Sequence, residues 1–362
     1  MRNLYAIIAM VIVGVIVGGS VYGVMASTST VTSTVTSTSV STVTISPTVQ
    51  STSSTTTSST TSSSSSALTP ITIGTAVAFS EVYYLPMMVA AQQGFWAQHG
   101  LQVTWQKFTG GPAETQALAS GQLSVGLTGC GVIFDAVSRG IGIKNVGTYM
   151  NTTEFGIIVA TNSSINTIDQ LNGSTIAITS TTGLEHVYSQ IIAQKNHLNF
   201  NYVTTGSLPN SLALLESGKA QAIDFTVGSV ASQIQAGQLK TIYNDTVALP
   251  SSWAEFCIAA TNSFIQSSPA VLKEVDAAFA QTIQYIINNP SYAEQIILNF
   301  TKSNSNVASL VYNTILPTWN PSLASSSTAL TNVDNVYVQY GITPSNIAVG
   351  VNETYTNAYI PS

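Results

Sequence analysis

The chain has 362 residues, only 7% of them charged, and a formal net charge of −6. Ordinary soluble proteins carry about 25% charged residues, so Ser, Thr, Asn and Gln must cover most of the surface. With only nine Lys and Arg side chains, no nucleic-acid partner is expected. A surface with few carboxylates changes its charge little as pH falls. This indicates an extracellular protein from an acidic habitat; heavy glycosylation is an alternative that is compatible with it.

Residues 4–25 form an almost uninterrupted apolar run without charge, preceded by Arg2. A helix of this length can cross the hydrocarbon core of a membrane. The positive flank places its start in the cytoplasm and the rest of the chain outside. A cleaved signal peptide is the alternative, because the run ends at the small residue Ala26. Residues 1–26 are therefore predicted to be a membrane anchor or a signal peptide, with an uncleaved anchor in the cytoplasmic membrane favoured.

Residues 27–66 consist almost entirely of Ser and Thr. They cannot bury enough apolar surface to offset the entropy of ordering, so a disordered stalk is predicted. Dense hydroxyls are typical of O-glycosylated stalks, and a linker without sugar is the alternative. Asn-x-Ser/Thr sequons in the rest of the chain are candidate N-glycosylation sites and support a location at the cell surface. They are Asn151, Asn162, Asn172, Asn244, Asn299 and Asn352.

After the stalk, short β-branched runs alternate with helical stretches, a pattern typical of an α/β fold with mostly parallel strands. Strands are expected at residues 71–74, 101–105, 124–127 and 175–178. Helices are expected at residues 87–98, 110–118, 184–195, 269–288 and 292–300. One unit occurs twice, as TQALASGQLSVG from Thr115 and as LALLESGKAQAID from Leu212. Each copy reads as a helix, a Ser-Gly stop and a short strand, so two similar α/β lobes are predicted.

Four motifs between residues 70 and 260 resemble a known family. They read AAQQGFWAQHGLQV from Ala90, ALASGQLSVG from Ala117, IDQLNGSTIA from Ile168, and the second repeat unit from Leu212. In this order they are similar to the solute-binding proteins of ABC importers for nitrate, taurine and aliphatic sulfonates, which share a fold with thiamine-pyrimidine synthase-like proteins. Ser124 stands where that family usually has Asp, and Ser174 where it has Lys. These departures leave the identity of the ligand open.

The resemblance implies a type II periplasmic-binding-protein fold, in which two lobes with parallel-type sheets are joined by two hinge strands. The hinge strands are expected at residues 156–161 and 256–261. Lobe one is then expected at residues 67–155 and 257–362, and lobe two at residues 156–256.

The resemblance further implies a function. The chain would capture a small solute between its lobes, either a nitrate, sulfonate or taurine-like anion or a related small organic molecule. It would deliver that solute to an ABC permease driven by its ATPase. No enzymatic activity, cofactor or metal site is expected, and a monomer is expected. One alternative is a stalk-mounted surface sensor or adhesive protein. A thiamine-pyrimidine synthase-like enzyme is disfavoured, because the chain lacks the cysteine-rich iron motif.

In open parallel sheets, ligands bind beyond the carboxyl ends of the strands, where helix N-termini carry unpaired N–H groups. The loop at residues 180–183 is the best anion candidate, and plain N-capping is its alternative. Aromatic side chains near the first strand could stack on an organic ligand, and acidic residues near the hinge could close the cleft. The candidate ligand-binding residues are Phe79, Ser80, Tyr83, Gly110, Gly111, Thr128, Gly129, Cys130, Ser180, Thr181, Thr182, Gly183, Asp224, Trp253 and Glu255.

The chain has two cysteines, Cys130 and Cys257, and three histidines. Their spacing does not match a metal site. In an oxidising compartment the cysteines can form a disulfide. Two separately buried thiols are the alternative, and Cys130 is expected to be a packing residue rather than a nucleophile.

Overall fold

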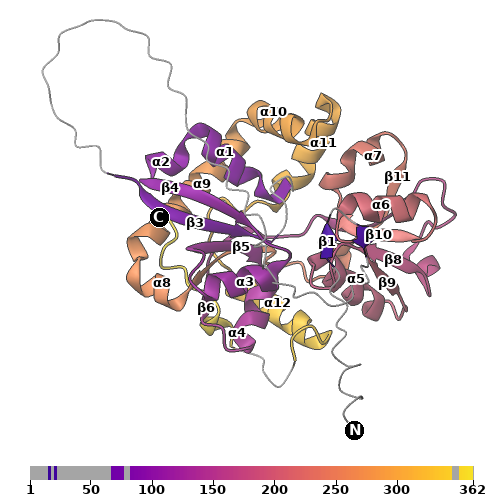
Figure 1. The fold of residues 1–362 in the computed structure, drawn as a ribbon, viewed down its shortest axis with the longest axis horizontal. Helices are drawn as coiled ribbons and strands as arrows, with labels where there is room; N and C mark the ends of the chain where they lie inside the picture. The colour runs from indigo at the N-terminus through magenta and orange to yellow at the C-terminus, as the bar shows by residue number, and fades with distance from the viewer. Residues whose placement is uncertain (1–14, 18–19, 23–66, 77–81, 345–349, 362) are drawn as a thin grey trace, which may run out of the picture. The chain divides into compact units, whose positions relative to one another are not determined.

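A computed structural model of the chain describes residues 15–17, 20–22, 67–76, 82–344 and 350–361 (Figure 1). Contacts divide the chain into two units, residues 1–40 and residues 41–362. In the first unit, β1 (Val15–Val17) pairs antiparallel with β2 (Ser20–Tyr22), where the sequence predicted a membrane helix. Other residues of the predicted anchor, and the stalk, lie outside the described residues. Among the residues that are described, no helix is long and apolar enough to cross a membrane.

The second unit contains two five-stranded sheets. The first has the strand order β4-β3-β5-β12-β6. β3 is parallel to β4 and β5, whereas β12 is antiparallel to both β5 and β6. The strands are β3 (Thr69–Thr75), β4 (Leu101–Lys107), β5 (Val125–Gly129), β6 (Ile143–Met150) and β12 (Phe256–Thr261).

The second sheet repeats this pattern, with the order β9-β8-β10-β7-β11. β8 is parallel to β9 and β10, and β7 is antiparallel to both β10 and β11. The strands are β7 (Phe155–Ala160), β8 (Thr175–Ile178), β9 (Asn201–Thr204), β10 (Ala222–Thr226) and β11 (Leu239–Asn244). Each sheet is therefore mixed rather than purely parallel. In each, one strand, β12 or β7, runs antiparallel to both of its neighbours.

The two strands predicted as hinges lie inside the sheets. β7 and β12 each pair on both edges, and each is buried except at its last residue. The chain passes from one sheet to the other just before them, through residues 151–154 and 245–255. Apolar character indicates that both runs are buried, but it does not show which strands are their neighbours. Sequence alone therefore places the hinge within these strands rather than just before them. The predicted lobe boundaries at 155/156 and 256/257 flank the second sheet and stay a prediction.

Helices follow the strands and cover the sheets (Figure 1). α5 and α9 have the predicted bounds, whereas the helix expected at 87–98 is interrupted at Gly94, which has a φ of 70°. A glycine adopts this left-handed conformation without steric penalty and so ends α1. The α-helices are α1 (Leu85–Gln93), α2 (Phe95–Gln98), α3 (Gly111–Ala119), α4 (Cys130–Ser138), α5 (Leu184–Lys195), α6 (Leu208–Glu216), α7 (Ala231–Gln235), α8 (Asn262–Ser267), α9 (Pro269–Asn288), α10 (Pro290–Thr301), α11 (Ser305–Ile315) and α12 (Ser327–Gln339). The 3₁₀ helices include η2 (Ile168–Leu171), η3 (Gly228–Val230), η4 (Asp245–Val247) and η7 (Val351–Glu353).

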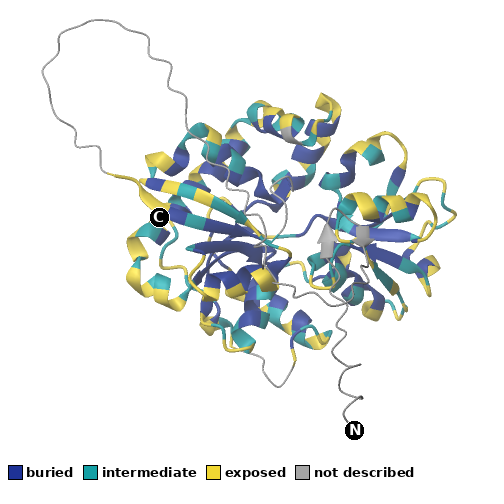
Figure 2. Cartoon of the chain, viewed as in Figure 1, coloured by how far each residue is buried: buried dark blue, intermediate teal, exposed yellow. Residues whose placement is uncertain are grey.

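The inner part of the first sheet is buried, as Figure 2 shows: β5, β6 and β12 are buried along almost their whole length, whereas the edge strand β4 is partly exposed. Successive side chains of a strand point to opposite faces, and β12 follows this rule. Its residues Phe256, Ile258 and Ala260 pack in one apolar cluster with α1, α9 and α11. Cys257 and Ala259 pack in a second cluster with α4 and α12. The helices that follow β12 in the sequence therefore cover the sheet formed by the first part of the chain.

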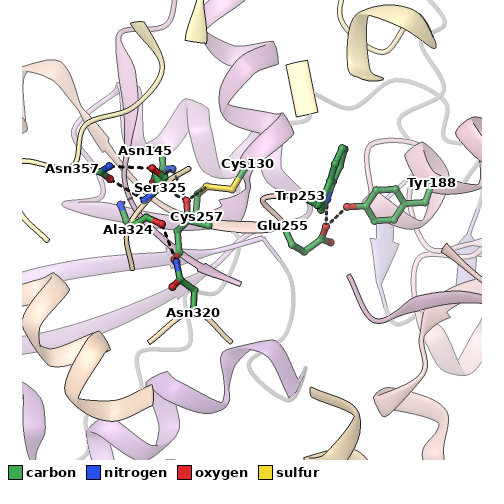
Figure 3. The surroundings of a disulfide bond; sticks show 12 residues. Cys130, Asn145, Tyr188, Trp253, Glu255, Cys257, Asn320, Ala324, Ser325 and Asn357 are labelled. Carbon is green, nitrogen blue, oxygen red and sulfur yellow. Dashed lines mark hydrogen bonds between the residues drawn. A yellow bond between two sulfur atoms is a disulfide. The ribbon is translucent and has the colours of Figure 1, made fainter. Parts of the chain in front are cut away.

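Cys130 and Cys257 form a disulfide bond, with Cα atoms 5.2 Å apart. Of the two alternatives that the sequence left open, the structure has the disulfide. Beside it lies a buried polar network (Figure 3): Asn145 Nδ2 donates to Ser325 Oγ at 2.9 Å, and the Thr148 and Ser325 hydroxyls lie 2.8 Å apart. This network joins the C-terminal segment to β6.

Candidate functional site

A cavity of about 550 Å³ lies between the two sheets, and both contribute to its wall. From the first sheet, the wall contains residues that follow β3, β4 and β5 and the first residue of β12. From the second sheet, it contains residues that follow β8, β9 and β10. These are the carboxyl ends of the parallel strands, where α/β proteins bind their ligands.

Four helices begin at this cavity. The residues that precede α3, α4, α5 and α6 are Gly110, Gly129, Gly183 and Ser207, and all four lie in the cavity wall. No side chain caps any of these helices. Side chains do cap α8, α11 and α12, namely Thr261, Asn304 and Ser326, and of these helices α11 also reaches the cavity wall, through Val307 in its first turn. The first N–H groups of α3, α5 and α6 therefore suit a ligand that carries hydrogen-bond acceptors, whereas that of α4, on Cys130, donates to the Glu255 carbonyl at 2.9 Å.

Gly110 lies where the two sides of the cavity approach each other, and Gly111 lies close against residues of its own side. A Cβ atom at Gly110, whose φ is 86°, would lie 2.9 Å from the Thr182 hydroxyl of the opposite side. At Gly111, a Cβ atom would lie 2.8 Å from Val132 and 2.9 Å from the Thr128 hydroxyl. A larger residue at either position would fill the space between the loops.

Aromatic rings form the apolar part of the wall. Tyr83 stacks on Phe256 with centroids 4.5 Å apart and an interplanar angle of 15°. On the other side, Phe155 and Phe225 lie 6.3 Å apart. Phe108 follows β4 and also lines the cavity. Such walls provide the apolar contact area that holds an organic ligand.

Glu185, in the first turn of α5, brings a carboxylate to the wall and places it in the loop before the helix. Its Oε1 accepts hydrogen bonds from the Thr179 and Ser180 N–H groups, at 3.1 and 3.2 Å, and from the Thr179 hydroxyl. The Thr182 N–H donates to Ser180 Oγ at 3.1 Å, and the Gly183 N–H donates to the Ser180 carbonyl at 3.2 Å. The loop predicted as the best anion site has thus used most of its N–H groups internally. It presents hydroxyls and a carboxylate to the cavity.

The predicted site residues fall into three groups. Lining the cavity are Tyr83, Gly110, Gly111, Thr128, Gly129, Ser180, Thr182 and Gly183. Outside its wall are Cys130, Thr181, Asp224, Trp253 and Glu255. Phe79 and Ser80 lie outside the described residues.

Sequence reasoning missed several residues of the wall. Lys107 and Phe108 end or follow β4, Glu185 lies in the first turn of α5, Ser207 precedes α6, and Phe225 lies in β10. Their positions beside strand ends were the available signal, because such positions face the same edge of the sheet. Periodicity alone did not distinguish Phe225 from a core residue.

Cys130 supports the wall without entering it. Phe256 pairs with Gly129, and Cys257 pairs with Thr128, across β12 and β5. The disulfide therefore joins the residues next to two wall residues, and both cysteines are at most 1% exposed. A sulfur in this bond is neither a nucleophile nor a ligand contact.

Glu255 lies at the end of the second passage between the sheets. Its Oε2 accepts hydrogen bonds from Trp253 Nε1, at 2.8 Å, and from the Tyr188 hydroxyl of α5 (Figure 3). Burial raises the pKa of Glu255 to about 7, although Tyr188, Trp253 and Thr153 stabilise its charge. Glu255 therefore connects the passage to the second sheet rather than lining the cavity.

Asp224 of β10 and Asp245 of η4 form a second buried acidic group behind the wall. Burial raises the pKa of Asp245 to about 8. Burial, and then the neighbouring Asp245, raise the pKa of Asp224 well above its usual value. Among the described residues, no group of three His, Cys, Asp or Glu side chains could hold a metal ion.

Comparison with known structures identifies this arrangement as the periplasmic-binding-protein fold. The alkanesulfonate-binding protein SsuA from Xanthomonas axonopodis pv. citri, bound to MOPS, has a TM-score of 0.66 at 16% identity, covering 79% of this chain and 98% of that one. The nitrate-binding protein NrtA from Synechocystis PCC 6803 has a TM-score of 0.63 at 11% identity, covering 81% and 87%. A Candida albicans protein with the generic periplasmic binding protein fold has a TM-score of 0.68 at 16% identity, covering 82% and 98%.

The family model for NMT1/THI5-like proteins matches residues 81–293. The chain belongs to this family, as the resemblance of its four motifs implied. No curated protein sequence matches the chain. The sulfonate-binding and nitrate-binding structural neighbours are binding proteins rather than enzymes.

Proposed function

We propose that the protein is the extracellular solute-binding component of an ABC importer, and that it delivers its solute to a permease driven by an ATPase. The single observation that carries this proposal is the cavity between the two sheets, where four uncapped helix N-termini meet. Attachment to the membrane through residues 4–25 and action as a monomer belong to the same proposal.

The cavity favours an organic solute over an inorganic anion. Nitrate occupies roughly the volume of two water molecules, on the order of 60 Å³, a small part of the cavity of about 550 Å³. The aromatic rings offer contact to an apolar or planar group. The helix N-termini suit a group that accepts hydrogen bonds, whereas the Glu185 carboxylate suits one that donates them.

Capture follows from contact with both sheets. A ligand shifts a conformational equilibrium only as far as it binds one state more tightly than the other. A solute between Phe108 on one side and Phe225 on the other gains its full contacts only when the two sides are close together. The closed form would then be the one that the permease recognises.

A thermal-shift screen tests the proposal. The panel is nitrate, bicarbonate, taurine, alkanesulfonates and aminopyrimidines, applied to the wild-type chain and to Glu185→Gln. A specific ligand at about 100 times its dissociation constant adds about 2.7 kcal/mol of stability. We expect an organic compound with a donor group to raise the midpoint temperature, and Glu185→Gln to reduce that shift.

The matched control is Glu216→Gln, an exposed carboxylate outside this cavity, which should leave the shift unchanged. A shift with nitrate alone would contradict the organic-solute assignment. No shift with any compound, on folded and ligand-free protein, would contradict the importer function and favour a surface sensor or adhesive protein.

A further inference from the structure

The six sequons divide into two groups when both of their recognised residues are considered. All six asparagines are exposed: Asn151, Asn162, Asn172, Asn244, Asn299 and Asn352. The sequon also requires the hydroxyl residue two positions later. An enzyme that acts on the folded chain must therefore reach both residues.

The acceptor atom, the side-chain nitrogen Nδ2, donates to no described residue in any of the six sequons. In contrast, nine asparagines outside sequons donate through Nδ2, among them the exposed Asn166, Asn201 and Asn210. The sequon asparagines that form side-chain hydrogen bonds use the oxygen: Asn172 Oδ1 accepts from the Asn199 N–H, Asn244 Oδ1 from the Thr246 N–H and hydroxyl, and Asn299 Oδ1 from Gln295 Nε2. A glycan attached at Nδ2 would break none of these bonds.

The hydroxyl residue separates the two groups. Ser164 and Thr246 are exposed and Ser174 is half-buried, which leaves the sequons of Asn162, Asn172 and Asn244 accessible. Thr153 and Thr354 are buried, at 4% and 1% exposure. Thr301, at the end of α10, is half-buried but lies in the wall of the candidate cavity, and its hydroxyl donates to the Ile297 carbonyl at 2.7 Å.

The three accessible sequons share one place in the fold. Asn162 follows β7, Asn172 follows η2 and precedes β8, and Asn244 ends β11, so all three belong to the second sheet and its connections. None of the three lines the cavity of the candidate site. Bulky sugars at these positions are therefore compatible with ligand binding.

We propose that Asn162, Asn172 and Asn244 are N-glycosylation sites of the folded protein, and that Asn151, Asn299 and Asn352 are not modified. The inference rests on the proposed location outside the cell. Glycans on the second sheet would add hydration to a surface that carries few charges. This is the role that charged side chains have in most soluble proteins.

The test is site-resolved peptide mass spectrometry of the full chain, secreted from a host that attaches N-glycans, together with a co-secreted reporter that carries a known sequon. We expect glycan mass on Asn162, Asn172 and Asn244 only. Ser164→Ala should remove the modification at Asn162 alone, and the conservative Ser164→Thr should keep it. The Ser164 side chain forms no hydrogen bond with a described residue, so neither change should alter folding.

Three results would overturn the proposal. An unmodified chain beside a modified reporter would exclude glycosylation. Equal modification of all six sequons would show that accessibility in the folded protein does not select the sites. Modification of only Asn151, Asn299 and Asn352 would contradict the assignment directly. Ligand binding is measured on the same preparation and does not depend on glycosylation. It therefore distinguishes failure of the glycosylation proposal from failure of the proposed function.

Discussion

The hydroxyl of Tyr188, in α5 beside the second sheet, donates a hydrogen bond to the buried carboxyl of Glu255, which leads the chain back into the first sheet (Figure 3). The backbone of Glu255 bonds to the first sheet on both sides. Its N–H donates to the Met150 carbonyl, and its carbonyl accepts from the Cys130 N–H, each at 2.9 Å. Glu255 therefore connects the two sheets at the second passage between them.

Tyr188→Phe should weaken this connection. The variant removes one of the two donors to Glu255 Oε2 and leaves Trp253 Nε1 as the other, so the free energy of unfolding should fall by about 0.5–1.5 kcal/mol. Urea denaturation at pH 6 measures it. Tyr292→Phe, which removes a hydroxyl that bonds to the exposed Gln92, is the control and should change it by less than about 0.5 kcal/mol. Equal effects of the two variants would contradict the role given to Tyr188.

The protein should become less stable as pH rises from about 4 to 8. Burial raises the pKa of Glu255 to about 7 and that of Asp245 to about 8, and raises those of Glu114 and Asp276. In the unfolded chain these groups titrate near 4. Between the two values the folded state holds more protons, so its stability is full below about pH 4 and is lost as pH rises through the folded pKa values. Glu255 alone accounts for about 3 kcal/mol. Thermal midpoints across this pH range measure the trend.

Asp276→Asn tests the contribution of one buried carboxyl to the pH dependence of stability. Burial alone raises the pKa of Asp276, whose Oδ1 lies beside Gly147 of β6. The amide cannot ionise, so the variant should gain stability over the wild type at pH 8 but not at pH 4. A midpoint that rises equally at both values, or a wild type that is most stable at pH 8, would show that these carboxyls do not govern stability.

Much of the acidic composition lies in the interior, and burial raises the pKa of five of these carboxyls, on Glu114, Asp224, Asp245, Glu255 and Asp276. At least seven of the fifteen acidic residues are buried: Glu114, Glu154, Glu185, Asp224, Asp245, Glu255 and Asp276. The sparse surface charge suggested an acidic habitat from the sequence. The buried carboxyls are a second reason to expect an acidic habitat. Composition could not provide it, because composition does not show which carboxyls are buried.

The disulfide should stabilise the protein through the long loop that it closes. Cys130 and Cys257 are 127 residues apart, and such cross-links typically contribute about 2–4 kcal/mol. The double variant Cys130→Ala/Cys257→Ala should lose about this much in urea denaturation. A wild-type chain denatured with a reductant should show a comparable loss. A double variant as stable as the wild type would contradict this contribution.

Gly183→Ala should impair ligand binding. A Cβ atom there would lie 2.2 to 2.5 Å from the Glu185 carboxylate, which would have to turn away from Thr179 and Ser180. We expect the ligand found in the thermal-shift screen to bind at least tenfold more weakly, as measured by isothermal titration calorimetry. Gly350→Ala, where a Cβ atom meets nothing within 4 Å, should bind normally. Normal binding by Gly183→Ala would exclude this loop from the site.

Much of the fold could be predicted from the sequence because local signals agreed with tertiary structure. Gly183 before α5 and Pro269 at the start of α9 mark helix starts, and each prediction had the observed bounds. The passages between the sheets lie directly before the two strands predicted as hinges. β7 and β12 are apolar strands whose neighbours come from distant parts of the chain, which the apolar pattern does not show.

The candidate site was predictable where it depends on strand ends. Gly110, Gly129 and Gly183 each precede a helix that follows a strand, and all three line the cavity. Asp224 and Glu255 are polar residues near the same strand ends, yet they lie behind the wall, where burial raises their pKa values. Sequence alone cannot show whether a carboxyl near a cleft points into it or away from it.

Contact of one solute with both sheets is tested most directly by ligand binding to two cavity variants. Phe108→Ala changes the wall beside the first sheet, and Phe225→Ala changes the wall beside the second. Isothermal titration calorimetry with the ligand from the screen should show at least tenfold weaker binding for each variant. If either variant binds as tightly as the wild type while remaining folded, the ligand is held by one sheet alone, and capture between the two is contradicted.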